Sequence, residues 1–109
     1  MSSYTPDNWV IVKVLAPSNE TIYKVLASWS GSYAYGGSWK LSSAIVAVLE
    51  EDEQYVLPQE SGSTYFCRKS RNSTSLTIAS VLQDLKDVIA SDPNNIKSIE
   101  IVDISEVES

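Results

Sequence analysis

The residues best suited to binding chemistry are concentrated in one short stretch, residues 29–39. This stretch holds two of the three tryptophans, two of the six tyrosines and three of the four glycines of the chain. Aromatic rings supply flat contact area, and glycines let the backbone turn or approach a partner closely. The alternative is that the two indoles close one end of the core while the glycines make tight turns. As a binding loop, the stretch offers these candidate contact residues: Trp29, Ser30, Tyr33, Tyr35, Gly36, Gly37, Ser38 and Trp39.

A second candidate site is the polar run at residues 68–75, which leads into a predicted helix. A helix N-terminus presents unpaired N–H groups and a partial positive charge, and arginine and serine side chains are good donors to anions. The alternative is a solvated connector in which Ser75 only caps the helix and the cations pair with surface acids. The candidate contacts to a phosphate or carboxylate are Arg68, Lys69, Arg71 and Ser73.

If the two segments lie together, the rings can stack on a planar base while the basic residues hold its phosphate. We therefore predict a non-enzymatic binding protein that captures a small anionic or nucleotide-like ligand. The second hypothesis is a protein-binding inhibitor, in which the same aromatic side chains form the centre of an interface and the acidic stretches meet a basic partner. A small carboxylate-dependent hydrolase is the third hypothesis.

Several kinds of catalytic and metal site are excluded by residue counts. The chain has no histidine, so it cannot build a catalytic triad of serine or cysteine with histidine. One cysteine without histidine cannot form a structural zinc site, and no phosphate-binding loop or dinucleotide fingerprint occurs. We therefore expect neither a metal nor a cofactor. Cys67 is either a thiol activated by the neighbouring cations or an inert strand residue.

Length and charge limit the partners. With 109 residues the chain is long enough for one domain and one core. Its net charge of −6 opposes a role in coating nucleic acid, because most of that affinity comes from neutralising phosphates. The sequence lacks a secretory signal and any apolar run long enough to span a bilayer, and its lone cysteine fits a reducing compartment. We expect a cytoplasmic protein, with a homodimer as an open possibility.

The hydrophobic pattern predicts an α+β domain with one antiparallel sheet of five to six strands and one long C-terminal helix. Strands 9–15 and 21–28 are expected to form a hairpin, and the apolar run at 41–49 is expected to be a central strand. The remaining predicted segments, in chain order, are a flexible arm at 1–8, strands at 54–57 and 63–68, a helix at 75–90, a strand ending the domain at 96–104, and a frayed tail at 105–109.

The predicted helix has a broad apolar stripe that is expected to cover one face of the sheet. Thr74 or Ser75 is suited to cap its first turn, and the run at 91–95 is suited to end it. The stripe consists of Ile78, Val81, Leu82, Leu85, Val88 and Ile89.

Three segments carry a resemblance to known proteins: residues 23–33, 36–42 and 61–69, with their spacing of tryptophan, glycine, serine and tyrosine. Across residues 9–70 the chain resembles a group of small, mostly uncharacterised proteins of phages and other mobile elements. These relatives tend to place a histidine after the position of Cys67, where this chain has Arg68, so chemistry that needs an imidazole is not carried over. The resemblance implies a phage accessory protein that interferes with host defence, by capturing a nucleotide signal or by docking on a defence protein.

Overall fold

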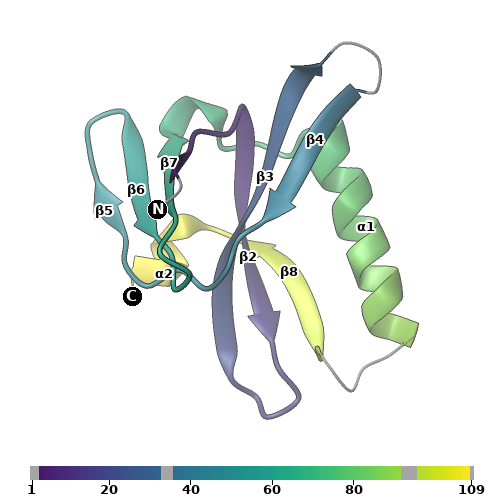
Figure 1. Cartoon of the computed structure of the whole chain (residues 1–109). Coiled ribbons are helices and arrows are strands. Elements are labelled where there is room, and N and C mark those ends of the chain that lie inside the picture. The colour runs from purple at the N-terminus through teal and green to yellow at the C-terminus, as the bar shows by residue number, and fades with distance from the viewer. Residues whose placement is uncertain (1–2, 33–35, 92–95, 109) are drawn as a thin grey trace.

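The computed structural model describes residues 3–32, 36–91 and 96–108, which form three layers (Figure 1). A long helix lies against one face of a four-stranded sheet, and a second four-stranded sheet lies against the other face. The predicted α+β class is confirmed, with two sheets in place of the single sheet that was expected. In the described part of the chain, no helix is long and apolar enough to cross a membrane.

The central layer, sheet B, is antiparallel throughout and has the order β4-β3-β2-β8. The predicted hairpin between β2 and β3 is confirmed, with a register that runs from Asn8 opposite Ser28 to Leu15 opposite Thr21. Asn19 has a φ of 71° in the connecting turn, a left-handed conformation that asparagine tolerates well. The strands are β2 (Asn8–Leu15), β3 (Thr21–Ser32), β4 (Gly36–Leu41) and β8 (Ser98–Val102).

The outer layer, sheet A, has the order β1-β7-β6-β5. Its first strand lies in the segment that was expected to be a flexible arm. Ser3 and Tyr4 pair in parallel with Thr64 and Tyr65, and Pro6 is fully buried. Residues 3–6 are therefore part of the packed structure. The strands are β1 (Ser3–Tyr4), β5 (Leu49–Glu50), β6 (Gln54–Pro58) and β7 (Thr64–Arg68).

The predicted central strand at 41–49 is wrong. β4 ends at Leu41, β5 begins at Leu49, and the residues between them cross from sheet B to sheet A. Ile45 donates its N–H to the Tyr23 carbonyl of sheet B, and Val46 donates to the Pro58 carbonyl of sheet A. The apolar run is therefore a crossing segment that packs Ile45 between the sheets, and it makes no regular ladder of its own.

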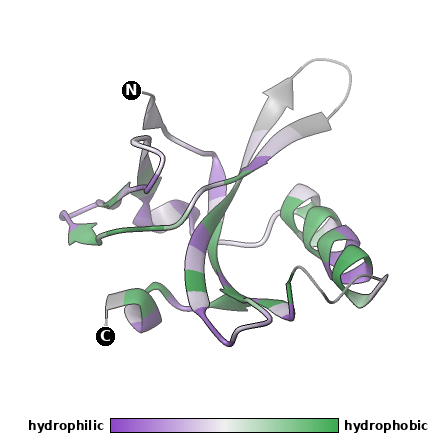
Figure 2. Cartoon of the chain, turned by 60° about the horizontal axis from the view of Figure 1, so that its bottom comes forward, coloured by the Kyte–Doolittle hydropathy of each residue, from purple (hydrophilic) through white to green (hydrophobic). Residues whose placement is uncertain are grey.

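The helix α1 (Leu76–Ser91) follows a short 3-10 turn, η1 (Lys69–Arg71), and confirms the helix predicted at 75–90. Its apolar stripe packs on sheet B, against side chains of β2, β3, β4 and β8, as expected from its spacing. Figure 2 shows green and purple bands on this helix, which reflect its amphipathic character. Val88 is 64% exposed, so its assignment to the buried stripe is wrong.

The last residues form a short helix, α2 (Ile104–Glu108), where a frayed tail was expected. Val107 packs against the core between the sheets. The Tyr23 hydroxyl donates to Glu106 Oε2 at 3.0 Å, and Lys13 Nζ lies 3.8 Å from the same carboxylate. These contacts hold the C-terminal end of the chain against sheet B.

Ser75 caps the start of α1. Its Oγ accepts the N–H of Ile78 at 3.1 Å and also shares a hydrogen bond with Ser28 Oγ at 2.9 Å. Because the first N–H groups of a helix have no partner within the helix, such a cap stabilises it. The second bond joins the start of α1 to β3.

Replacing this cap tests its contribution to stability. We expect Ser75→Ala to lower the free energy of unfolding by about 1 kcal/mol, since it removes an N-terminal cap. Its exposed neighbour provides the control, because Thr74→Ala should change that free energy by less than about 0.5 kcal/mol. Urea unfolding of the three proteins gives the comparison. Equal losses for the two variants would contradict the assignment of Ser75 as the cap.

Candidate functional site

The residues predicted to form an aromatic loop lie mostly in a β-hairpin made by β3 and β4. β2 begins at Asn8, opposite Ser28, so beyond that point β3 pairs only with β4 in the described residues. In Figure 1 the hairpin extends past the start of α1. Ser30 lies within β3, and Gly36 and Gly37 lie within β4. Tyr33 and Tyr35 lie outside the described residues.

The two tryptophans of the hairpin face opposite sides. Trp29 pairs with Ser38, and on the next rung of the ladder Ser28 pairs with Trp39. Directly opposed residues share a face of the sheet, and successive residues of a strand alternate between faces. One indole therefore lies on the side of sheet A and the other on the side of α1. They cannot stack on the same ligand.

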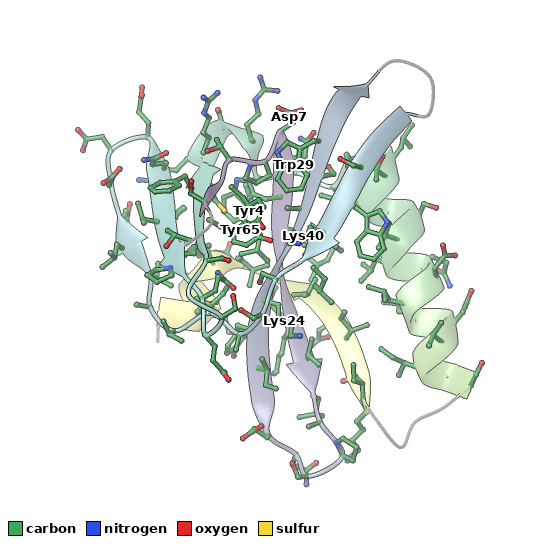
Figure 3. All side chains as sticks on the ribbon, in the orientation of Figure 1. Tyr4, Asp7, Lys24, Trp29, Lys40 and Tyr65 are labelled. Atoms are coloured by element: carbon green, nitrogen blue, oxygen red, sulfur yellow. The ribbon has the colours of Figure 1, made fainter. Side chains whose placement is uncertain are left out.

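Trp29 is held in the structure on the side of sheet A (Figure 3). Its Nε1 donates to the Thr5 carbonyl at 3.0 Å, and its ring meets the Tyr4 ring edge-on at 6.2 Å. Tyr4 in turn stacks on Tyr65 at 5.0 Å, and Lys40 Nζ lies 5.3 Å from the centre of the Tyr4 ring. Trp29 thus holds Tyr4 and Thr5 against sheet A. The core-closing alternative expected both indoles to pack in this way.

Trp39 lies on the other face and is 48% exposed. It sits on β4, which is an edge strand of sheet B, between exposed Ser38 and exposed Lys40. The exposed indole of Trp39, on a sheet edge, is available to a partner. The indole of Trp29 is less exposed and already contacts Thr5 and Tyr4.

Lys69, the first residue after β7, faces a carboxylate. Lys69 Nζ lies 2.6 Å from Glu50 Oε2 and 5.1 Å from the centre of the Tyr55 ring. The hydrogen bond to Glu50 raises the pKa of Lys69 above its ordinary value. The charge of Lys69 is therefore already balanced by Glu50, which begins the acidic turn at residues 50–53.

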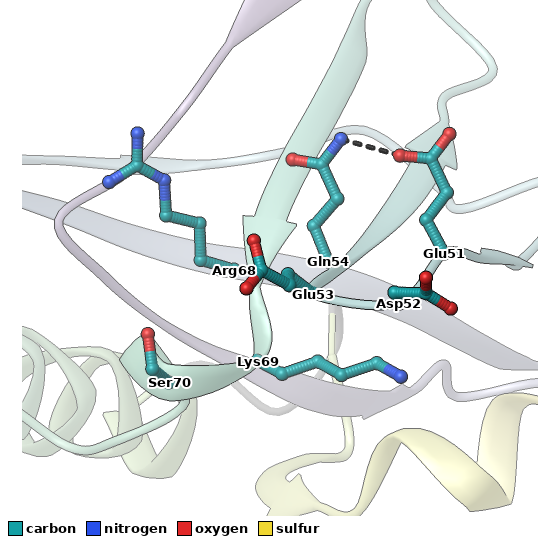
Figure 4. A pocket seen from close by; sticks show the side chains of 7 residues that line it. All are labelled: Glu51, Asp52, Glu53, Gln54, Arg68, Lys69 and Ser70. Atoms are coloured by element: carbon teal, nitrogen blue, oxygen red, sulfur yellow. Dashed lines mark hydrogen bonds between the residues drawn. The ribbon is translucent and has the colours of Figure 1, made fainter.

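A hollow of about 1000 Å³ lies between the basic residues and the acidic turn (Figure 4). Gln54 Nε2 donates to Glu51 Oε1 at 2.7 Å on its wall. Three carboxylates on one side weaken the attraction of this hollow for a phosphate, because like charges repel. Its lining residues are Glu51, Asp52, Glu53, Gln54, Arg68, Lys69 and Ser70.

Two hydrogen bonds connect the polar run to the base of the hairpin. Asn8 Nδ2 donates to Ser73 Oγ at 2.7 Å, and Ser75 bonds to Ser28 as described above. The structure therefore brings Ser73 and the helix start beside the hairpin, whereas Arg68 and Lys69 line the hollow at the acidic turn. Arg71 is exposed. The candidate anion site is thus divided between two environments.

Cys67 is fully buried among the residues between the two sheets. Burial raises the pKa of its thiol from an ordinary 9.0 to about 12. Because the thiolate is the reactive form, this favours the inert residue over the activated thiol.

Tyr4 and Lys40 were missed as neighbours of the candidate site. Tyr4 was placed in an arm because a polar segment with Pro6 surrounds it, and a lone aromatic residue there is the only signal of packing. Lys40 reaches Tyr4 only because Trp29 and Lys40 share a face, which depends on the register of the hairpin.

Comparisons with models of protein families, with curated proteins and with solved structures found no match. The resemblance to phage proteins therefore stays a prediction.

The buried thiol predicts a loss of stability at high pH. Its pKa is raised on folding, so the thiol stabilises the folded state below about pH 9, and that contribution is lost as the pH rises toward about 12. The loss is at most about 1.4 kcal/mol per pH unit for one group. We expect Cys67→Ala to show a shallower decline between about pH 9 and pH 11 than the unmodified protein. Urea unfolding across this range measures it, and identical slopes would contradict the assignment.

Proposed function

We propose that the protein is a non-enzymatic binding protein that docks on another protein through the β3–β4 hairpin. The observation that carries this proposal is the position of Trp39, 48% exposed on an edge strand. Tryptophan is enriched among the few residues that dominate protein interfaces, because its large ring removes much apolar area from water at low entropic cost. This is the second of the functions expected from the sequence.

The backbone of β4 supports the same proposal. In the described part of the chain, β4 pairs with β3 on one side and with no strand on the other. An edge strand offers N–H and C=O groups to an added strand, and side chains beside it give specificity. Trp39 and the β4 edge together provide both kinds of contact.

Capture of a small anion has less support. It needs aromatic rings that share one face, and Trp29 and Trp39 lie on opposite faces of the hairpin. It also needs cations, and of the three predicted to bind the anion Lys69 is paired with Glu50. The hollow between residues 51–54 and residues 68–70 is lined by neither Trp29 nor Trp39.

The class of partner follows from charge and from the resemblance. A net charge of −6 favours a partner with a basic surface, since complementary charge raises association rates. The resemblance to phage accessory proteins suggests a host defence protein as that partner.

Truncation of Trp39 tests the docking site. We expect Trp39→Ala to weaken the complex by about 2 kcal/mol or more, as removal of a central interface tryptophan does. Tagged protein incubated with bacterial extract and analysed by native mass spectrometry would show the co-purifying protein. Val88→Ala, which truncates an exposed side chain on α1, should leave the complex unchanged. Retention of the same partner by Trp39→Ala would contradict the proposal.

A titration with nucleotides tests the competing function. We expect tryptophan fluorescence to stay constant on addition of mono-, di- and cyclic nucleotides, because Trp39 and Trp29 lie on different faces of the hairpin and Lys69 is paired with Glu50. A saturable change that is lost in a variant carrying Arg68→Ala and Arg71→Ala would instead favour ligand capture.

A further inference from the structure

The outer face of sheet A carries a row of apolar side chains across three strands. Leu49 of β5 lies opposite Val56 of β6, and Val56 lies opposite Phe66 of β7. Directly opposed residues share a face, so the three side chains form one continuous cross-strand row.

This row points away from the core. Its neighbours Leu57, Tyr65 and Cys67 are buried between the sheets, and strand residues alternate between faces. Leu49 is 54% exposed, and Val56 and Phe66 are partly exposed. The row therefore lies on the surface of the described structure.

Val46 and Pro58 extend the row. Their chain neighbours Ile45 and Gln59 form a bridge and are turned inward. Val46 donates its N–H to the Pro58 carbonyl at 3.0 Å, and because strand residues alternate between faces, Val46 and Pro58 face outward. Val46 is 61% exposed. Figure 2 shows the segment between β4 and β5 as a hydrophobic stretch. We call the set the outer apolar face: Val46, Leu49, Val56, Pro58 and Phe66.

The two sheets differ in what covers them. The face of sheet B that points away from sheet A is covered by α1, whose apolar stripe packs on it. In the described ranges, α1 lies on the far side of sheet B, and α2 packs Ile104 and Val107 into the cluster between the sheets, so neither helix covers the corresponding face of sheet A in this way (Figure 1). A contiguous exposed apolar patch on a soluble domain marks an interaction site more often than a random surface does.

Charge indicates what kind of partner fits. The row ends beside the acidic turn formed by Glu50, Glu51, Asp52 and Glu53, all of them exposed, of which Glu50 is paired with Lys69. A second copy of a chain with net charge −6 would add like charge. A partner with basic residues next to its apolar ones is attracted instead.

We propose that the outer apolar face binds an amphipathic helix of another protein, with basic residues that meet the acidic turn. Such a helix would place its apolar stripe on sheet A in the way that α1 places its own on sheet B. Trp39 lies on the α1 side of sheet B, so this surface is separate from the hairpin. The inference does not depend on the function proposed for the hairpin.

The test uses a labelled synthetic peptide of about 18 residues, with leucines on one helical face and lysines on the other. A second peptide has the same leucines with glutamates. We expect the protein to bind the lysine peptide in fluorescence anisotropy at about 0.15 M salt and to bind the glutamate peptide at least about tenfold more weakly. Absence of binding to the lysine peptide would overturn the proposal.

Matched variants locate the apolar contact. Val46→Ser with Leu49→Ser removes two exposed side chains of the outer apolar face, and should weaken binding at least about tenfold. The control is Leu76→Ser with Val88→Ser, which removes a leucine and a valine from α1. Both are more exposed than Leu49 and Val46, and their loss should leave binding unchanged. Trp39→Ala should also bind as the unmodified protein does. Equal losses in the two double variants would overturn the proposal.

Charge variants separate specific binding from general attraction to an acidic protein. Asp52→Asn with Glu53→Gln should weaken binding severalfold and reduce its dependence on salt. Glu20→Gln with Asp84→Asn removes the same charge at exposed sites elsewhere and should have little effect. Equal effects would show attraction to overall charge and overturn the proposal. A homodimer in sedimentation equilibrium that Val46→Ser with Leu49→Ser dissociates would also overturn it, in favour of a second copy as occupant.

Discussion

The burial of β2 on both faces is the constraint on which the other layers depend. Val10, Val12 and Val14 face α1, while Trp9 and Ile11 face sheet A. β2 also pairs with a strand along each edge, β3 on one side and β8 on the other. Because its side chains need cover on both faces, α1 and sheet A are both required. The Trp9 Nε1 hydrogen bond to the Arg68 carbonyl, at 2.7 Å, connects this strand directly to β7.

Elements defined by local patterns could be predicted from the sequence. The β2–β3 hairpin has β-branched strands and a turn at residues 16–20, and α1 has a helical apolar period and a capping serine. The run at 41–49 was mistaken for a strand because apolar residues on both faces describe a central strand and a buried crossing segment equally well. Only the pairing of Leu49 with Val56 and the bonds of Ile45 and Val46 distinguish them, and these are non-local.

The candidate site shows the same limit. Residue types mark the segment around Trp39 as a candidate site, but the sides to which the two indoles point depend on the register of Trp29 against Ser38. The pairing of Lys69 with Glu50 joins residues far apart in the sequence, so a cluster of cations that looks free in the sequence is partly neutralised in the fold. The hairpin and the outer apolar face lie on different layers, so the two docking surfaces that we propose are separate.

Photocrosslinking is the most direct measurement of the central claim, that the hairpin docks through the face that carries Trp39. Benzoylphenylalanine would be placed at position 39 in one protein and at position 29 in another, and each would be irradiated in bacterial extract. The account predicts a covalent protein adduct from position 39 and little or none from position 29, where the side chain packs against Tyr4 and Thr5. The same adduct from position 29, or none from position 39 while a partner co-purifies, would contradict it.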